Sequence, residues 1–362
     1  MMQIVFFLFL GTIFCGCNNP KSPLDIIPKL PILIDIGDKE KIVFCWGKDL
    51  YAIDPNEPAE VDPDKPCRAN PNENTAELIL PSPYDEAFPK WLPDGKRLVF
   101  SSMSQFGEIK FYMMDFNKKK VFDMGKMCKK LLKYGLYDKP RWSLECKKIV
   151  FSGRDGIYIA DANGNNIKKA VDIPESGGVT NSISFSPDLR RILFDFWDSK
   201  DKSKGGIYTV EIATGRWKRL TYDNIIIARN PNYSPDGSKI VFEGSLYGEK
   251  KWKKIYMCRR ICIMDADGKN LHRLTKDDNS ERITEFNPSW SPDSKKVVFT
   301  GVFTDFERIN LKEEDFILKE IKKWELFIVD VETGNIKRLT YSGKTPSHSP
   351  SWRPHPKSLK KE

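Results

Sequence analysis

The chain has 362 residues, enough for one large domain or two ordinary ones. Its composition, 40% hydrophobic and 12% aromatic, excludes an intrinsically disordered chain. The formal net charge is +9, but Lys and Arg are scattered among Asp and Glu, so the charge indicates a solvated surface and argues against nucleic-acid binding.

The N-terminal stretch 1–17, MMQIVFFLFLGTIFCGC, is an apolar run that is short for a membrane span and is placed like a signal peptide. Its end, Phe14-Cys15-Gly16-Cys17, resembles a bacterial lipobox in which Cys17 is the lipidated residue. A plain secretory signal or a membrane anchor is the alternative. Each of these readings predicts that the mature chain leaves the cytoplasm for the periplasm or cell envelope.

Residues 18–38 contain Pro20, Pro23, Pro28 and Pro31. Such spacing disfavours a helix and favours an extended chain, which at ~3.1 Å per residue reaches up to ~60 Å. We therefore expect a tether between a lipid anchor and a folded domain over residues 39–362. A disordered N-terminal tail is the alternative for the same stretch.

A short motif built around an aromatic residue recurs six times in the rest of the chain. Its copies lie about 50 residues apart, a period typical of propeller blades and other repeat arrays. The copies are Pro89-Lys-Trp91, Pro140-Arg-Trp142, Ile183-Ser-Phe185, Pro231-Asn-Tyr233, Pro288-Ser-Trp290 and Pro350-Ser-Trp352.

Each copy is followed by a similar series of turns and strands. The aromatic residue precedes a turn of the Ser-Pro-Asp type, in which Pro presets the backbone and Asp caps it. Two β-rich runs and a shorter closing strand follow, as in Lys239-Ile-Val-Phe242, Ile261-Cys-Ile-Met-Asp265 and Arg273-Leu-Thr275. We expect the turn acids to be structural rather than catalytic; they are Asp94, Asp188, Asp236 and Asp293.

Four strands per repeat predict an all-β fold, a six-bladed β-propeller of four-stranded blades. Because proline cannot donate to a β-ladder, the strand with the Pro-x-aromatic motif should be the edge strand that faces the centre of the ring. Only ten residues follow Trp352, too few for three more strands. The missing strands are expected at residues 41–44, 50–54 and 77–80, so that both termini close one blade.

The pattern Pro-x-Trp-Ser-Pro-Asp-Gly-Lys-x-Ile-x-Phe resembles the repeat of the TolB-like propeller family over about residues 39–356. The resemblance implies a six-bladed fold and a protein-binding role in the cell envelope. The family has a separate N-terminal domain before its propeller, whereas this chain has the Pro-rich stretch there.

The sequence contains no recognisable catalytic or metal-binding motif, so no catalytic residue, metal site or cofactor is predicted. The chain has three histidines, too few in suitable positions for a histidine-ligated metal centre. Six cysteines remain beyond Cys17, and an even number in an exported chain permits disulfides. Cys45–Cys67 and Cys128–Cys146 are feasible pairs, and buried thiols are the alternative.

Two insertions, residues 244–258 and 302–325, lengthen the later blades. The first interleaves Lys with aromatic residues that include Trp252. In the second, Ile317, Ile321 and Trp324 have the spacing of a short amphipathic helix. Each insertion either packs on its own blade or projects toward a partner, since loops on a rigid scaffold often carry recognition.

Residues four positions before the core aromatics should surround one mouth of the central channel, where a shared ligand site is expected. They are Ala87, Asp138, Asn181, Arg229, Phe286 and His348. The candidate binding residues are Trp252, Trp324, Asp138, Asn181, Arg229 and His348.

The favoured function is a non-catalytic, monomeric envelope scaffold that binds a protein or an envelope polymer and is attached to the membrane by its lipid anchor. One alternative is a propeller enzyme, a lyase or hydrolase acting on polysaccharide or peptide at the channel mouth. Another is a sensor domain for a small ligand.

Overall fold

The computed structural model describes residues 27–29, 32, 40–56, 76–80, 82, 84–104, 109–136, 140–143, 145–173, 182–197, 205–222, 225–246, 259–275, 282–308, 316–341 and 347–354. Cys17, Asp138, Asn181 and Trp252 lie outside these residues. Within them, no helix is both long enough and apolar enough to cross a membrane.

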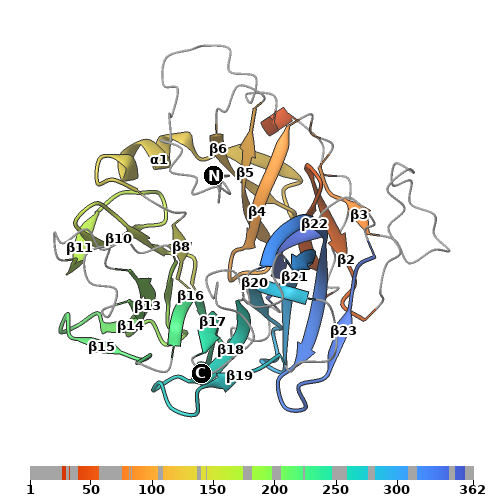
Figure 1. Cartoon of the computed structure of the whole chain (residues 1–362). Coiled ribbons are helices and arrows are strands. Elements are labelled where there is room, and N and C mark those ends of the chain that lie inside the picture. The colour runs from red at the N-terminus through yellow and green to blue at the C-terminus, as the bar shows by residue number, and fades with distance from the viewer. Residues whose placement is uncertain are drawn as a thin grey trace.

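The described strands form six antiparallel sheets of four strands each, arranged as blades in a ring (Figure 1). Blade 1 contains β4 (Asp85–Trp91), β5 (Arg97–Met103), β6 (Ile109–Asp115) and β7 (Lys120–Asp123). Blade 2 contains β8 (Arg141–Trp142), β9 (Lys148–Ser152), β10 (Gly156–Asp161) and β11 (Lys168–Asp172). Blade 3 contains β12 (Ile183–Phe185), β13 (Arg191–Phe196), β14 (Gly206–Glu211) and β15 (Trp217–Arg219).

Blade 4 contains β16 (Ile225–Tyr233), β17 (Lys239–Leu246), β18 (Arg260–Asp265) and β19 (His272–Arg273). Blade 5 contains β20 (Arg282–Trp290), β21 (Lys296–Arg308), β22 (Phe316–Asp330) and β23 (Ile336–Arg338). The closing blade contains β24 (Ser347–Trp352), β1 (Ile42–Trp46), β2 (Asp49–Ile53) and β3 (Glu77–Leu78). This architecture confirms the predicted six-bladed propeller.

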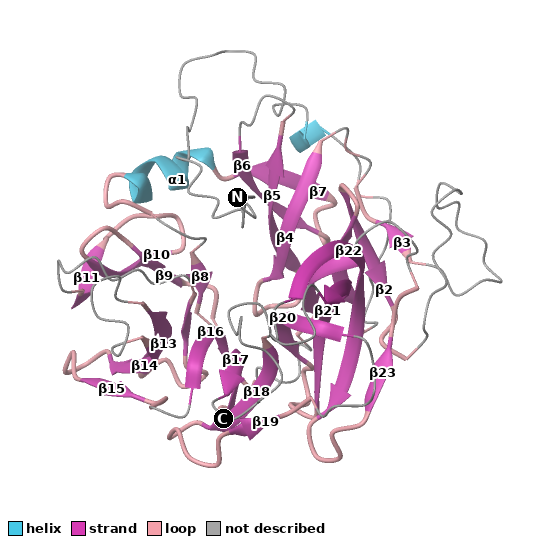
Figure 2. Ribbon diagram, viewed as in Figure 1, coloured by secondary structure: helices cyan, strands magenta, loops and turns pink. Residues whose placement is uncertain are grey.

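Strands dominate the described part of the molecule, and the short α-helix α1 (Gly125–Leu132) lies at its rim (Figure 2). The helix follows the outer strand of blade 1. It buries Met127, Cys128 and Leu131 in a cluster that also contains Ile149 and Phe151 of blade 2. The connection between the two blades therefore adds to the core between them.

The closing blade joins the two ends of the chain, as the sequence predicted. Strand β24 pairs with β1, and Ile42 lies opposite Trp352. Two serine hydroxyls fasten this blade to its neighbours: Ser289 Oγ accepts the Trp352 N–H and Ser351 Oγ accepts the Trp91 N–H, each over 3.1 Å. Because both bonds involve backbone N–H groups of inner strands, they hold adjacent blades at the centre of the ring.

The apolar cores lie between neighbouring blades. Trp91 packs with Val43 and Leu50 of the closing blade, and its ring stacks on Phe116 at 5.1 Å. Trp290 packs in the same way against blade 4. Each strand that carries the motif is the edge strand of its sheet, so the predicted edge position is confirmed.

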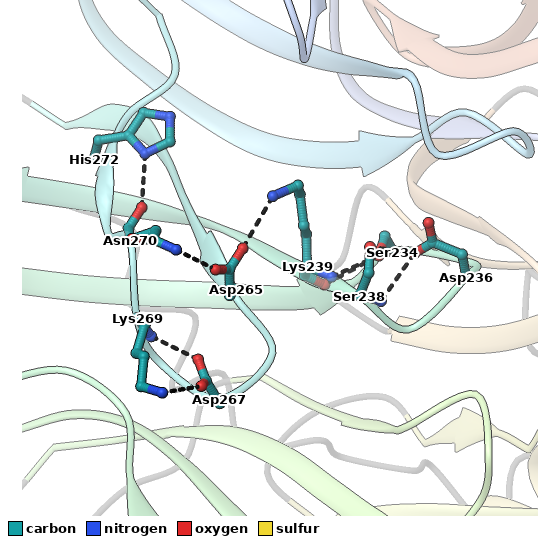
Figure 3. Close-up of polar contacts among 9 residues, drawn as sticks. All are labelled: Ser234, Asp236, Ser238, Lys239, Asp265, Asp267, Lys269, Asn270 and His272. Carbon is teal, nitrogen blue, oxygen red and sulfur yellow. Dashed lines mark hydrogen bonds and ion pairs between the residues drawn. The ribbon is translucent and has the colours of Figure 1, made fainter.

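The Ser-Pro-Asp turns are structural. In blade 4, Ser234 Oγ donates to Asp236 Oδ1 over 2.6 Å, and the Ser238 N–H donates to the same oxygen over 2.9 Å (Figure 3). Next to this turn, Lys239 forms an ion pair with Asp265 at 3.0 Å (Figure 3). These contacts tie the turn to the following strand and confirm that Asp236 is a turn residue.

The second insertion is a long β-hairpin, so the prediction of a helix over residues 311–324 is wrong. Ile317, Ile321 and Trp324 lie in β22, which pairs with β21 from Lys296 to Arg308. The register shifts twice along this pairing, between Phe303 and Thr304 and again two residues later. Each shift interrupts the two-residue alternation of a strand, and the resulting spacing of apolar residues imitates a helical stripe.

The structure also bears on the cysteines and on the proline-rich stretch. Cys146 is a thiol and forms no bridge with Cys128. Burial raises the pKa of the Cys146 thiol, and the nearby Asp94 carboxylate raises it further.

Ile27, inside the predicted tether, is fully buried among residues of the closing blade and blade 1.

Candidate functional site

The inner strands all begin at one end of the ring, which we call the mouth face. Of the residues four positions before the core aromatics, the structure describes Ala87, Arg229, Phe286 and His348, in β4, β16, β20 and β24. The second strand of each blade runs antiparallel to the first and returns to this end, as the pairing of Phe286 with Thr300 shows. The insertion that follows β21 therefore belongs to the mouth face as well.

Three rings from three strands meet on the mouth face and form what we call the aromatic cluster: Phe286, Trp324 and His348. The ring centroids of Phe286 and Trp324 are 5.2 Å apart, and those of Trp324 and His348 are 5.6 Å apart. Both pairs have edge-to-face geometry, which the ring quadrupoles favour. All three side chains are partly exposed, so the cluster is accessible on the mouth face.

A buried ion pair supports the aromatic cluster. The Arg259 guanidinium lies 5.6 Å from the centroid of the Phe286 ring and forms an ion pair with Glu243. The Glu243 side chain is completely buried and also accepts the Asn287 N–H over 2.9 Å and the Asn230 Nδ2–H over 2.5 Å. One carboxylate thus fixes the arginine beside the cluster and joins blades 4 and 5.

The inner strands bulge directly after the mouth-face positions. Phe88, Asn230, Asn287 and Ser349 have φ between 50° and 54°, and the strand registers shift at the same places. A bulge leaves a backbone N–H outside the ladder, and carboxylates from neighbouring blades accept two of these groups. Asp195 Oδ2 accepts the Asn230 N–H at 3.4 Å, and Glu243 accepts that of Asn287.

His348 is neutral at pH 7. Burial lowers its pKa to about 4, and its Nδ1 lies 3.0 Å from the Ser349 hydroxyl. The cluster therefore presents three uncharged rings beside one arginine. Such a surface can pack against aromatic or aliphatic groups and can donate hydrogen bonds from the guanidinium.

The candidate residues predicted from the sequence fall into three groups. Trp324 and His348 are in contact through their rings, so the insertion and the channel-mouth positions form one site rather than two. Arg229 lies apart from this contact, with its guanidinium 6.0 Å from the centroid of the Trp197 ring. Asp138, Asn181 and Trp252 lie outside the described residues.

Sequence reasoning missed Glu243 and Arg259. A signal for Glu243 was present: it follows Phe242 at the end of a β-rich run, where blade 3 has Asp195 and other copies have Ser101, Ser152 or Thr300. Acids in two of the copies at a position that is small and neutral in these others predict a special hydrogen-bonding role. Among the described residues, no group of three or more His, Cys, Asp or Glu side chains is arranged to hold a metal ion.

No family model matches the chain. An uncharacterized protein of Agrobacterium fabrum is 24% identical over 272 residues, covering 74% of this chain and 80% of that protein. The crystal structure of TolB from Acinetobacter baumannii matches 88% of this chain and 68% of its own, with 19% identity and a TM-score of 0.58. The chain has a TolB-like propeller fold.

Two further solved structures share this TolB-like fold. A protein from Agrobacterium tumefaciens assigned as TolB matches 77% of this chain and 94% of its own, with 19% identity and a TM-score of 0.51. A chain of the nidogen/laminin complex matches 87% of this chain and 98% of its own, with 11% identity and a TM-score of 0.54. At these identities the similarity establishes the fold.

Proposed function

We propose that the protein is a non-catalytic scaffold of the cell envelope that binds a protein or an envelope polymer through the mouth face. The aromatic cluster is the observation that carries this proposal. Phe286, Trp324 and His348 are partly exposed, and the Glu243–Arg259 ion pair stiffens their surroundings. Trp, Tyr and Arg are the residues most enriched at binding hot spots, because they combine a large contact area with few rotatable bonds.

The fold supports the same proposal. Blades interlocked in a ring are rigid, so side chains at one end can be presented without rearrangement on binding. A chain of similar fold forms part of the nidogen/laminin complex, where a ring of this kind takes part in a protein assembly. The TolB-like repeat of this sequence points in the same direction.

The location in the envelope is also proposed. It rests on the apolar run at residues 1–17, on the lipobox-like position of Cys17 and on the TolB-like fold. In this arrangement the lipid on Cys17 holds the protein at a membrane, and the propeller reaches its partner from there.

Site-specific photocrosslinking in intact envelopes tests the binding proposal. A photoreactive amino acid is placed at Trp324 in one variant and, as a matched control, at Lys269 on the opposite face of the ring in another. We expect a discrete crosslinked product from position 324, identifiable by mass spectrometry, and none from position 269. Equal products from both positions would contradict binding through the mouth face.

The affinity of the identified partner then gives a quantitative prediction. Trp324→Ala should weaken binding at least tenfold, equivalent to about 1.4 kcal/mol, because it removes the central ring of the cluster. Lys269→Ala should leave the affinity unchanged. If instead Arg229→Ala and His348→Ala eliminate a measurable turnover of an oligosaccharide or peptide while Trp324→Ala does not alter it, the protein is an enzyme rather than a scaffold.

A further inference from the structure

A short motif, Arg-Leu-Thr, ends the outer strand region of three consecutive blades. Its copies are Arg219-Leu-Thr221 in blade 3, Arg273-Leu-Thr275 in blade 4 and Arg338-Leu-Thr340 in blade 5. The three threonines are almost completely buried. A buried hydroxyl needs hydrogen-bond partners, and the partners of the threonine hydroxyl differ among the three copies.

In blades 4 and 5 the threonine hydroxyl donates to a carboxylate from this chain. Thr340 Oγ1 accepts the Leu326 N–H over 2.9 Å and donates to Glu325 over 2.6 Å. Thr275 Oγ1 donates to Glu285, which belongs to the inner strand of the next blade. The two carboxylates thus come from two different positions. Glu325 directly precedes the residue whose N–H the threonine accepts, and Glu285 lies five residues before the next core aromatic.

Blade 3 has the same threonine but neither carboxylate. Thr221 Oγ1 accepts the Ile207 N–H over 2.9 Å, as Thr340 does with Leu326. The residue that precedes Ile207, and so corresponds to Glu325 before Leu326, is Gly206, and the position five before Tyr233 is Ala228. Gly206 has φ +152°, and a Cβ there would lie 2.6 Å from Thr221 Oγ1, so no side chain fits. No described residue accepts the Thr221 hydroxyl hydrogen.

The arginine of blade 3 lies between two aromatic rings, as its counterpart in blade 5 does, but no acid among the described residues forms an ion pair with it. The Arg219 guanidinium lies 5.9 Å from the Tyr208 ring centroid and 5.7 Å from that of Tyr222. Arg338 is likewise placed over Phe303 and Tyr341.

The hydrogen bonds of the two arginines differ. The Arg338 NH2 group donates to Glu325 over 2.9 Å, whereas the Arg219 NH2 group donates to the Gly205 carbonyl over 2.6 Å. Arg219 Nε is buried and has no hydrogen-bond partner among the described residues.

From this comparison we propose that Arg219 and Thr221 of blade 3 bind a carboxylate supplied from outside the chain. The carboxylate of the ligand accepts the Thr221 hydroxyl hydrogen, as Glu325 does for Thr340 and Glu285 does for Thr275. A guanidinium and a hydroxyl together match the two oxygens of a carboxylate, and stacking on two rings holds the guanidinium in place. The ligand is either a free carboxylate or the acidic side chain of a bound peptide. This inference is independent of the aromatic cluster.

Binding is measured by calorimetric titration of the full mature chain with two probes at constant ionic strength. One probe is glutarate, and the other is a short Gly-Glu-Gly peptide with blocked ends, compared with its Gln version. The proposal expects at least one probe to bind, and tighter binding of glutarate or of the peptide identifies the source. Sulfate serves as the test of general anion binding.

Two variants locate the binding at blade 3. Arg219→Met should weaken binding of the probe at least tenfold. Arg338→Met should leave the affinity for the probe unchanged, because Arg338 is already paired with the Glu325 carboxylate. Ala228→Glu places an internal carboxylate where blade 5 has Glu285 relative to Thr275. This variant should also weaken binding of the probe at least tenfold. Its melting temperature should be higher than that of Ala228→Gln, whose side chain has the same size but no charge.

Several results would overturn the proposal. These are binding that is unchanged in Arg219→Met, equal weakening in Ala228→Glu and Ala228→Gln, sulfate binding as tight as glutarate, and no binding of either probe. In the last case, a combined Asp198→Asn, Asp201→Asn and Asp223→Asn variant that gains binding would show that an acid of the chain itself occupies the site.

Discussion

Replacing Glu86 by Gln should remove a large pH dependence from the stability of the ring. Glu86 lies in β4, where blade 1 meets the closing blade, and its side chain is 2% exposed. Its Oε1 accepts the Ser102 hydroxyl over 3.2 Å, but its Oε2 has no hydrogen-bond partner among the described residues. Burial raises the pKa of Glu86 to about 8, and the neighbouring Asp49 carboxylate raises it further.

A second copy of the same position shows why Glu86 is exceptional. Glu285 occupies the corresponding place in blade 5, and its Oε2 accepts the Ile261 N–H over 3.0 Å and the Thr275 hydroxyl. At the junction of Glu86, the position of Thr275 is taken by Leu80. A carboxylate at Glu285 is therefore stabilised by two donors, whereas Glu86 is stabilised by protonation.

The sign and size of the effect follow from proton linkage. The folded state holds the Glu86 proton up to about pH 8, whereas the unfolded chain releases it near the ordinary value of about 4.5. Stability is therefore greatest below the ordinary pKa and falls as the pH rises through the folded-state pKa. Between pH 5 and pH 7 the free energy of unfolding should decrease by roughly 2 to 3 kcal/mol because of Glu86.

Urea unfolding of wild type and Glu86→Gln at pH 5, 7 and 8.5 measures this loss. The free energy of unfolding of the variant should agree with that of wild type within about 1 kcal/mol at pH 5, and it should be higher by roughly 2 to 3 kcal/mol at pH 7. Glu285→Gln is the matched control and should be less stable by about 1 to 3 kcal/mol, because two buried donors lose their carboxylate. A difference between wild type and Glu86→Gln that stays constant from pH 5 to 8.5 would refute the reasoning.

Three other predictions concern His348, Ser351 and Cys17. Burial lowers the pKa of His348 to about 4, so the stability of wild type should fall as the pH drops from about 6.5 to 4, and His348→Phe should reduce that fall in urea titrations. Ser351→Ala removes the acceptor of the Trp91 N–H and should lower the free energy of unfolding by about 1 to 2 kcal/mol, as measured by urea unfolding. Cys17→Ser should release a folded protein from the membrane fraction, and a cleaved variant that stays in the membrane would argue against lipidation at Cys17.

The sequence allowed the ring to be predicted because its determinants are local and repeated. Turn residues, β-rich runs and edge prolines recur in each copy, so six weak signals support one another. The strands before residue 81 could be assigned to the closing blade because Trp352 is followed by too few residues. The hairpin of blade 5 could not be predicted, since register shifts destroyed the alternation on which strand assignment depends.

The aromatic cluster was predictable only in part, because its three residues are far apart in the sequence. Phe286, Trp324 and His348 belong to three strands, and sequence reasoning treated Trp324 and His348 as rival sites. Their contact depends on how blade 5 packs against the closing blade. The partners of Glu86 and Glu285 depend in the same way on the neighbouring blade, so two identical residues at corresponding positions have different chemistry.

The aromatic cluster also replaces a contact that the previous junctions make with carboxylates. Asp195 joins blade 3 to blade 4 and Glu243 joins blade 4 to blade 5, each by accepting an N–H at a bulge. The corresponding residue of blade 5 is Thr300, whose buried hydroxyl has no partner among the described residues. At this junction Trp324, which also contacts Phe286 of its own blade, connects blade 5 to the closing blade through its edge-to-face contact with His348.

This substitution of rings for a carboxylate affects how the binding test must be read. Edge-to-face pairs contribute about 0.5 to 1.5 kcal/mol each beyond their buried area, so Trp324→Ala should lower stability as well as affinity. Trp324→Phe keeps an aromatic ring between Phe286 and His348 and should retain most of the stability. Partner affinity measured for both variants well below their melting temperatures then separates the two roles. A loss of affinity in Trp324→Phe without a loss of stability assigns the indole itself to recognition.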